Sequence, residues 1–122
     1  MPTLVLPDHA RLEKSGPNWQ IWALVSSSVT GAPVLKLRRW VLAPRACTPL
    51  STHTTVQERF FYVIKGAGTV TVNNERHPLA QESIVWIEPG DQWSFNAGPQ
   101  GLELLEAIAP ETITPDQEAL DE

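Results

Sequence analysis

The sequence predicts a single all-β domain, and three observations lead to that prediction. Short apolar runs rich in valine, isoleucine and aromatic residues recur along the chain. Glycine, proline and asparagine separate them at a spacing of about 8–12 residues, which is typical of a sandwich or barrel. A chain of 122 residues is long enough for one core and too short for two.

Two strands are expected in the first third of the chain. Residues 19–26 (WQIWALVS) and 34–42 (VLKLRRWVL) are rich in the aromatic and aliphatic side chains that favour strands. Turn residues lie between them at 30–33 (TGAP). Pro44 and Pro49 mark an irregular connection, because proline cannot donate to a central sheet ladder.

The middle of the chain is expected to form two strands and a tight turn. Residues 59–65 (RFFYVIK) are strongly strand-like, and residues 69–72 (TVTV) alternate as a half-buried strand does. A glycine-rich break at 66–68 separates the two strands. Asn73 and Asn74 form the turn, because asparagine tolerates a positive φ.

Three further strands are expected at residues 83–87 (SIVWI), 92–96 and 102–108 (LELLEAI). Turns at 89–91 (PGD) and 98–101 (GPQG) separate them. The last segment has the composition of a helix, but the turns and the rhythm of the chain favour a strand.

A helix is expected only at the C-terminus. Thr114 suits the N-cap, Pro115 the first helical position and Gln117 the third, which together form a capping-box pattern. Residues 110–122 are therefore expected to form a short acidic helix or a frayed tail.

Composition and charge exclude several classes of function. A formal net charge of −5 argues against a nucleic-acid surface, so Lys36, Arg38 and Arg39 are expected to form a solvated strand edge. The single cysteine, Cys47, cannot form an internal disulfide and is expected to be buried. No run approaches the ~20 apolar residues of a membrane span, and the N-terminus lacks the features of a secretory signal. We expect a soluble cytoplasmic protein.

A family resemblance rests on the run FFYVIKGAGTVTVNNERHPL, followed by SIVWIEPGDQWSF. With His53, Gly66 and Gly90 in place, segment 47–101 resembles the cupin family, whose motifs are G-x5-H-x-H-x3,4-E-x6-G and G-x5-P-x-G-x2-H-x3-N. The resemblance implies a small jelly-roll barrel, or double-stranded β-helix, as one domain over residues 1–122.

The same resemblance implies that most of the usual metal ligands are replaced. Thr55 stands at the second histidine position, Arg59 at the glutamate position and Trp93 at the histidine of the second motif, so only His53 matches a ligand. An arginine cation repels a metal and cannot bind it. No cofactor is therefore expected, but a divalent metal stays open if a β-bulge turns Glu58 inward to join His53.

Strand alternation predicts which side chains line a pocket. With His53 facing the barrel interior, every second residue of the same strand also faces inward, and Glu58 faces outward. Arg59 offers a planar fork to a carboxylate or phosphate, and Trp93 and Phe95 offer flat apolar walls. We therefore expect a small polar or anionic organic ligand. The candidate residues are His53, Thr55, Gln57, Arg59, Phe61, Trp93 and Phe95.

Several functions stay open at this point, and whether the chain is an enzyme is one of the questions. It could bind a small molecule without metal, act as a metal-dependent dioxygenase, isomerase or lyase with rearranged ligands, or only support dimerisation. A metal-independent isomerase or epimerase could use His53 as a general base and Arg59 to hold an anion. Phe60, Tyr62 and Ile64 are too apolar to face water together, so the N-terminal strands or a second subunit should cover them. We expect a homodimer, with no nucleic-acid or membrane partner.

Overall fold

The computed structural model describes residues 10–25, 36–53 and 57–109, and all the regular structure among them is β-strand. The strands pair antiparallel in the order β1-β2-β3-β8-β5-β6, with β4 on β8 and β7 on β5. The all-β prediction is confirmed, while the expected C-terminal helix lies outside the described residues. The strands are β1 (Arg11–Gly16), β2 (Trp19–Val25), β3 (Lys36–Leu42), β4 (Ser51–Thr52), β5 (Glu58–Val72), β6 (Glu75–Leu79), β7 (Ile84–Ile87) and β8 (Gln92–Ala109).

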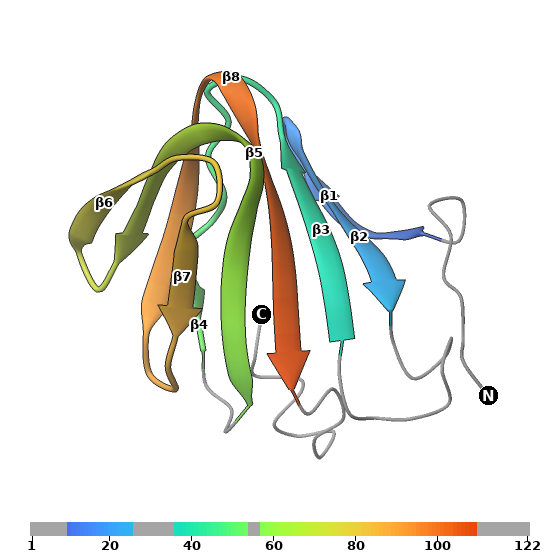
Figure 1. Ribbon diagram of the computed structural model, residues 1–122, viewed down its shortest axis with the longest axis vertical. Coiled ribbons are helices and arrows are strands. Elements are labelled where there is room, and N and C mark those ends of the chain that lie inside the picture. The colour runs from blue at the N-terminus through green and yellow to red at the C-terminus, as the bar shows by residue number, and fades with distance from the viewer. Residues whose placement is uncertain (1–9, 26–35, 54–56, 110–122) are drawn as a thin grey trace.

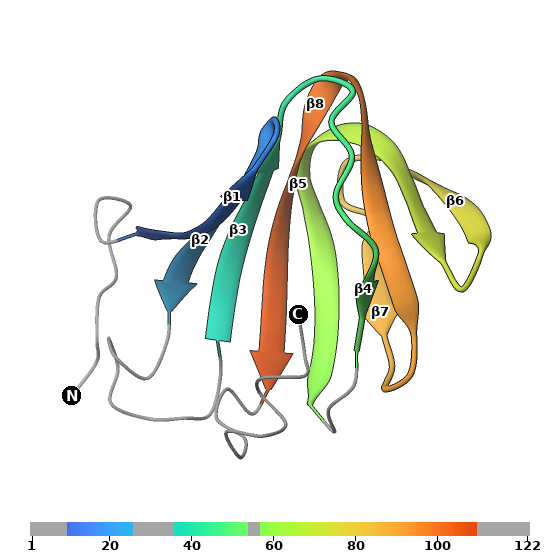
Figure 2. The same cartoon turned by 180° about the vertical axis from the view of Figure 1, so that it is seen from behind.

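Two long strands, β5 and β8, build both layers of the jelly roll. Residues 58–66 of β5 pair with residues 102–109 of β8, and β7 and β3 flank this pair. Residues 68–72 of β5 pair with residues 93–97 of β8, and β6 and β4 flank that pair. We call the first group, with β1 and β2 added beyond β3, the large layer, and the second group the small layer. Figures 1 and 2 show β5 and β8 arching over together where the layers meet.

Glycines allow the two long strands to bend without ending. Gly66 has φ +86° and Gly101 has φ +85°, values that L side chains rarely adopt. A Cβ atom at Gly66 would collide with the carbonyl oxygen of Gly101, because the two backbones touch there. The expected break at 66–68 and the expected turn at 98–101 are therefore bends inside continuous strands, and the register shifts beside Gly66.

Strand alternation assigned the faces of β5 correctly. Arg59, Phe61 and Val63 are buried between the layers, whereas Glu58 and Ile64 are exposed. The ladder of β5 is regular around Glu58, since its two register shifts lie further along the strand.

The structure contains three strands that the sequence did not predict, and it confirms one predicted turn. The structure adds β1, β4 and β6, which the sequence did not indicate because they are charged, very short or largely exposed. The expected asparagine turn is confirmed, with φ of 50° at Asn73 and 69° at Asn74. The part of the chain that the structure describes contains no helix that could cross a membrane.

An apolar patch lies on the outer face of the large layer. Phe60 and Trp86 are paired across β5 and β7, and their rings stack with centroids 5.7 Å apart. Ile84 and Trp86 are more than half exposed. The described N-terminal strands β1 and β2 lie at the opposite end of the sheet, beyond β3, and so do not cover it. We call this the outer patch; its residues are Phe60, Tyr62, Ile64, Ile84 and Trp86.

Candidate functional site

Six of the seven candidate residues are buried in the structure. Each is at most 5% exposed, and they come from β5, β8 and the segment between β4 and β5. Thr55 lies outside the described residues. Whether this set binds a ligand stays a prediction. The six are His53, Gln57, Arg59, Phe61, Trp93 and Phe95.

Four aromatic rings fill the space between the two layers. Phe61 lies 4.9 Å from Trp93 and 4.8 Å from Phe95, measured between ring centroids. Trp40 of β3 joins them at 5.5 Å from both Phe61 and Trp93. Aromatic pairs at these distances contribute beyond the area they bury. Trp93 therefore fills volume in the core, and Trp40 is a central residue that the sequence did not single out.

A buried carboxylate, Glu106 of β8, organises the polar part of the interior. Its side chain is 0% exposed. Arg38 donates to its Oε1 from Nε at 2.5 Å, and Trp40 donates to the same oxygen from Nε1 at 2.8 Å. Arg59 Nε lies 3.2 Å from Oε2, close enough for an ion pair although the N–H is not aligned for a hydrogen bond. Two guanidinium groups thus share one carboxylate.

The network extends from Arg38 to the edge strand β1. Arg38 donates from Nη1 to Glu13 at 2.6 Å, and Lys36 lies 3.0 Å from the same carboxylate. Burial raises the pKa of Glu13, but hydrogen bonds and charges from Arg38 and Lys36 outweigh burial and hold this pKa below its usual value. Burial similarly opposes the charge on Arg38, but Glu106 and then Glu13 raise the pKa of Arg38 above its ordinary value.

Two sequence-based expectations about this network were wrong. Arg38 was expected in a solvated strand edge, but it is 9% exposed, whereas its neighbour Arg39 is exposed. Alternation along β3 explains the difference, because Arg38 shares its inward face with Trp40 and Leu42. Cys47 was expected to be buried and is exposed.

His53 connects two neighbouring segments through its backbone and its ring. Its N–H donates to the Asp91 carbonyl at 2.9 Å, and its own carbonyl accepts from Gly90 at 2.6 Å. Its Nε2 contacts the Gln57 carbonyl oxygen. Because a carbonyl only accepts, Nε2 carries a proton in this contact.

The donor groups of the described residues do not fit a transition-metal site. Glu58 faces outward, away from the buried His53, and His53 Nε2 is engaged as a donor. Glu106 is held by Arg38 and Arg59, whose charges repel a metal ion. Within the three described ranges, no group of three or more His, Cys, Asp or Glu side chains is arranged to hold a metal.

A cavity of about 220 Å³ lies where β1, β2 and β3 of the large layer face the segment that enters β4. Two cations, Lys14 and Arg38, contribute to its wall, and none of the described residues that line it is a carboxylate. We call it the edge cavity. Its lining is Lys14, Trp19, Ile21, Arg38, Trp40, Pro49, Leu50 and Ser51.

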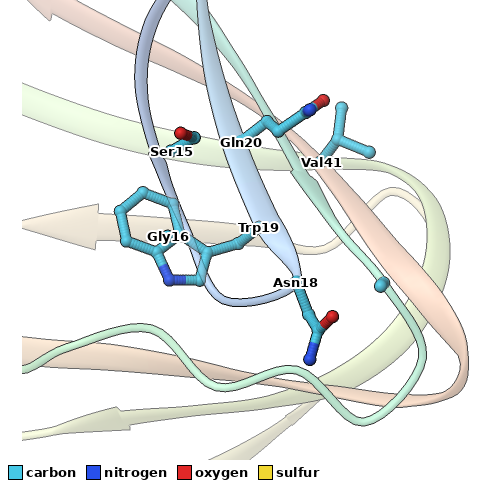
Figure 3. A pocket seen from close by; sticks show the side chains of 7 residues that line it. Ser15, Gly16, Asn18, Trp19, Gln20 and Val41 are labelled. Carbon is cyan, nitrogen blue, oxygen red and sulfur yellow. The ribbon is translucent and has the colours of Figure 1, made fainter.

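A second hollow lies beside the turn between β1 and β2. Figure 3 shows the Trp19 indole lying against Gly16, where any Cβ atom would collide with the ring. Ser15, Asn18 and Gln20 complete a shallow polar rim, and none of its lining residues within the described ranges is ionisable. Trp19 lines both hollows, so it forms part of the wall between them.

The comparisons with known proteins agree with this architecture. The family model described as "Cupin domain" matches residues 38–108. KdgF from Halomonas sp. has a similar structure, with a TM-score of 0.77 and 13% identity, over 92% of this chain and 96% of that one. A predicted oxalate decarboxylase from Thermotoga maritima gives a TM-score of 0.75 and 19% identity, over 88% and 98%.

A larger protein also contains this fold. Salicylate 1,2-dioxygenase from Pseudoaminobacter salicylatoxidans, solved as adducts with gentisate, gives a TM-score of 0.70 and 22% identity. The match covers 88% of this chain but only 28% of that one. At these identities the likeness shows the shared fold. The comparison with curated proteins finds no match.

Proposed function

Because the chain belongs to the cupin family, we propose that it binds a small organic anion on the inner face of its barrel, without a metal. One observation carries this proposal. The inner face presents two arginines, Arg38 and Arg59, beside a cluster of aromatic rings. Arg59 and Trp93 stand at positions where the family resemblance implies metal ligands.

The chemistry of these groups supports an anionic ligand with an apolar body. A guanidinium presents a planar fork that matches a carboxylate, and it packs well on aromatic faces. Arg38 lies over the Trp40 ring at 5.8 Å, and Arg59 lies over the Trp93 ring at the same distance. The names of two similar structures refer to small carboxylates, oxalate in one and salicylate and gentisate in the other.

The metal-dependent alternative finds less support in the described residues. It needs Glu58 turned inward, and the regular ladder around Glu58 leaves that side chain exposed. His53 alone gives one imidazole where three or four ligands are usual. We therefore propose a metal-free ligand site.

Elemental analysis together with a thermal-shift screen tests this function. We expect iron, manganese, nickel and zinc far below one per chain, and a rise in Tm with small carboxylates but not with the matching neutral amides. Arg59→Ala should weaken the carboxylate response, with Arg39→Ala, an exposed arginine on the opposite face, as the control. A metal at about one per chain would contradict the proposal, as would amides that stabilise as well as carboxylates.

A further inference from the structure

We propose that the edge cavity is the binding site, and that it takes a carboxylate carried on a flat apolar group of about the size of one ring. This inference rests on the proposed function and adds the location and the ligand class. The cavity of about 220 Å³ is smaller than the roughly 300–1,000 Å³ pockets that hold drug-sized ligands.

The charge of the cavity wall selects an anion. Among the residues that the structure describes, Lys14 and Arg38 are the only ionisable ones that line it. The two carboxylates that hold Arg38, Glu13 and Glu106, contact its Nε and Nη1 and do not line the cavity. These carboxylates fix the guanidinium in place but leave its Nη2 without a hydrogen-bond partner among the described residues. A carboxylate ligand would supply that partner.

A β-bulge places Lys14 at the cavity. The register between β1 and β2 shifts between Leu12 and Lys14, so Glu13 is the extra residue of a bulge. After the bulge Lys14 pairs with Ile21, a buried residue that also lines the cavity. The bulge therefore lets Lys14 line the cavity, while Glu13 contacts Arg38 without lining it.

The remaining wall suits a flat apolar group. The rings of Trp19 and Trp40 are nearly parallel, with an interplanar angle of 20° and centroids 6.4 Å apart. Ile21 and Pro49 add apolar surface, and Leu50 is 64% exposed at the rim. Burial of an aromatic or alicyclic ring against these side chains would be favourable in proportion to the apolar area removed from water.

Trp40 separates this site from the interior position expected from the sequence. It lines the cavity and packs against Phe61, Trp93 and Phe95, none of which lines it. Arg59 does not line the cavity either, and Glu106 links it to Arg38. A ligand at the edge would thus contact Arg38 directly, with Arg59 as a positioning residue.

The experiment titrates benzoate, and benzamide as its neutral analogue, into three proteins by calorimetry. These are the wild type, Lys14→Glu, and Lys65→Glu as a control that makes the same charge change at an exposed site outside the cavity. Lys14 is exposed too, so both variants should fold, and circular dichroism checks that they do.

We expect benzoate to bind the wild type and Lys65→Glu with the same affinity, and to bind Lys14→Glu about tenfold or more weakly. Titration of benzamide should give no heat of binding. If wild type and both variants bind benzoate equally, the cavity is not the site, although the proposed function would stand. If benzoate fails to bind the wild type, the proposed function is overturned together with this inference. Benzamide binding as tightly as benzoate would overturn the assigned ligand class.

Discussion

At the scale of single residues, the interior depends on Glu106. Its carboxylate contacts both Arg38 and Arg59, and all three side chains are buried. Removing one member of a buried ion pair usually costs far more than the pair contributes, because the remaining charge is left without compensation.

Glu106→Gln should therefore destabilise the protein by about 3–5 kcal/mol, measured by urea unfolding. Glu103→Gln makes the same chemical change on the outer face of β8, where Glu103 lies 4.0 Å from the exposed Arg39. Glu103→Gln should lower the free energy of unfolding by no more than about 1 kcal/mol. Equal losses in the two variants would show that the buried network contributes nothing special.

The sequence could predict some of these residues and not others. Alternation from His53 correctly placed Arg59 and Phe61 inside. It could have placed Glu106 inside as well, because Leu102, Leu104 and Glu106 occupy alternate positions of one strand. The helix-like composition of LELLEAI made this strand alternation hard to recognise. The sequence could not place Trp19 and Trp40 beside the same cavity, because their rings come close to each other only through the pairing of β2 with β3.

At the scale of elements, we make one prediction for the Gly66 bend in β5 and another for the edge strand β1. Gly66→Ala should destabilise the protein more than Gly90→Ala does. Both glycines have a positive φ, but a Cβ atom at Gly66 would also strike the Gly101 carbonyl, whereas none would be met within 4 Å at Gly90. Urea unfolding should show that Gly90→Ala lowers the free energy of unfolding by about 1 kcal/mol, because of its positive φ alone. Gly66→Ala should lower it by about 2–4 kcal/mol, because the steric collision adds to the cost of φ. Equal losses of unfolding free energy in the two variants would mean that the bend at Gly66 tolerates a side chain.

Glu13 makes the attachment of β1 sensitive to acid. Its pKa is lowered in the folded state, so its contribution to stability is present above the ordinary glutamate value of about 4.3 and is lost as pH falls through the lower folded value. The protection factors of β1 amides against hydrogen exchange, which correct for the pH dependence of the intrinsic rate, should therefore fall below pH 4 in the wild type. In Glu13→Gln these protection factors should already be lower at neutral pH and should change less on acidification. An identical pH profile in the two proteins would contradict the role of Glu13.

At the scale of the whole molecule, we propose that a second copy of the chain covers the outer patch. The patch is formed by aromatic and aliphatic side chains of β5 and β7 and lies away from the described N-terminal strands. Trp86→Lys should convert a dimer to a monomer in light scattering. Leu12→Lys changes an exposed leucine outside the patch and should leave the dimer intact. A monomeric wild type would contradict the homodimer.

The central claim is that this barrel binds an organic anion through its own cations and aromatic rings. The most direct test is a calorimetric titration of benzoate into chelator-treated protein, repeated after adding one equivalent of iron, manganese, nickel or zinc. We expect benzoate to bind the metal-stripped protein with an affinity that the added metals leave unchanged. Binding that appears only after a metal is restored would contradict it.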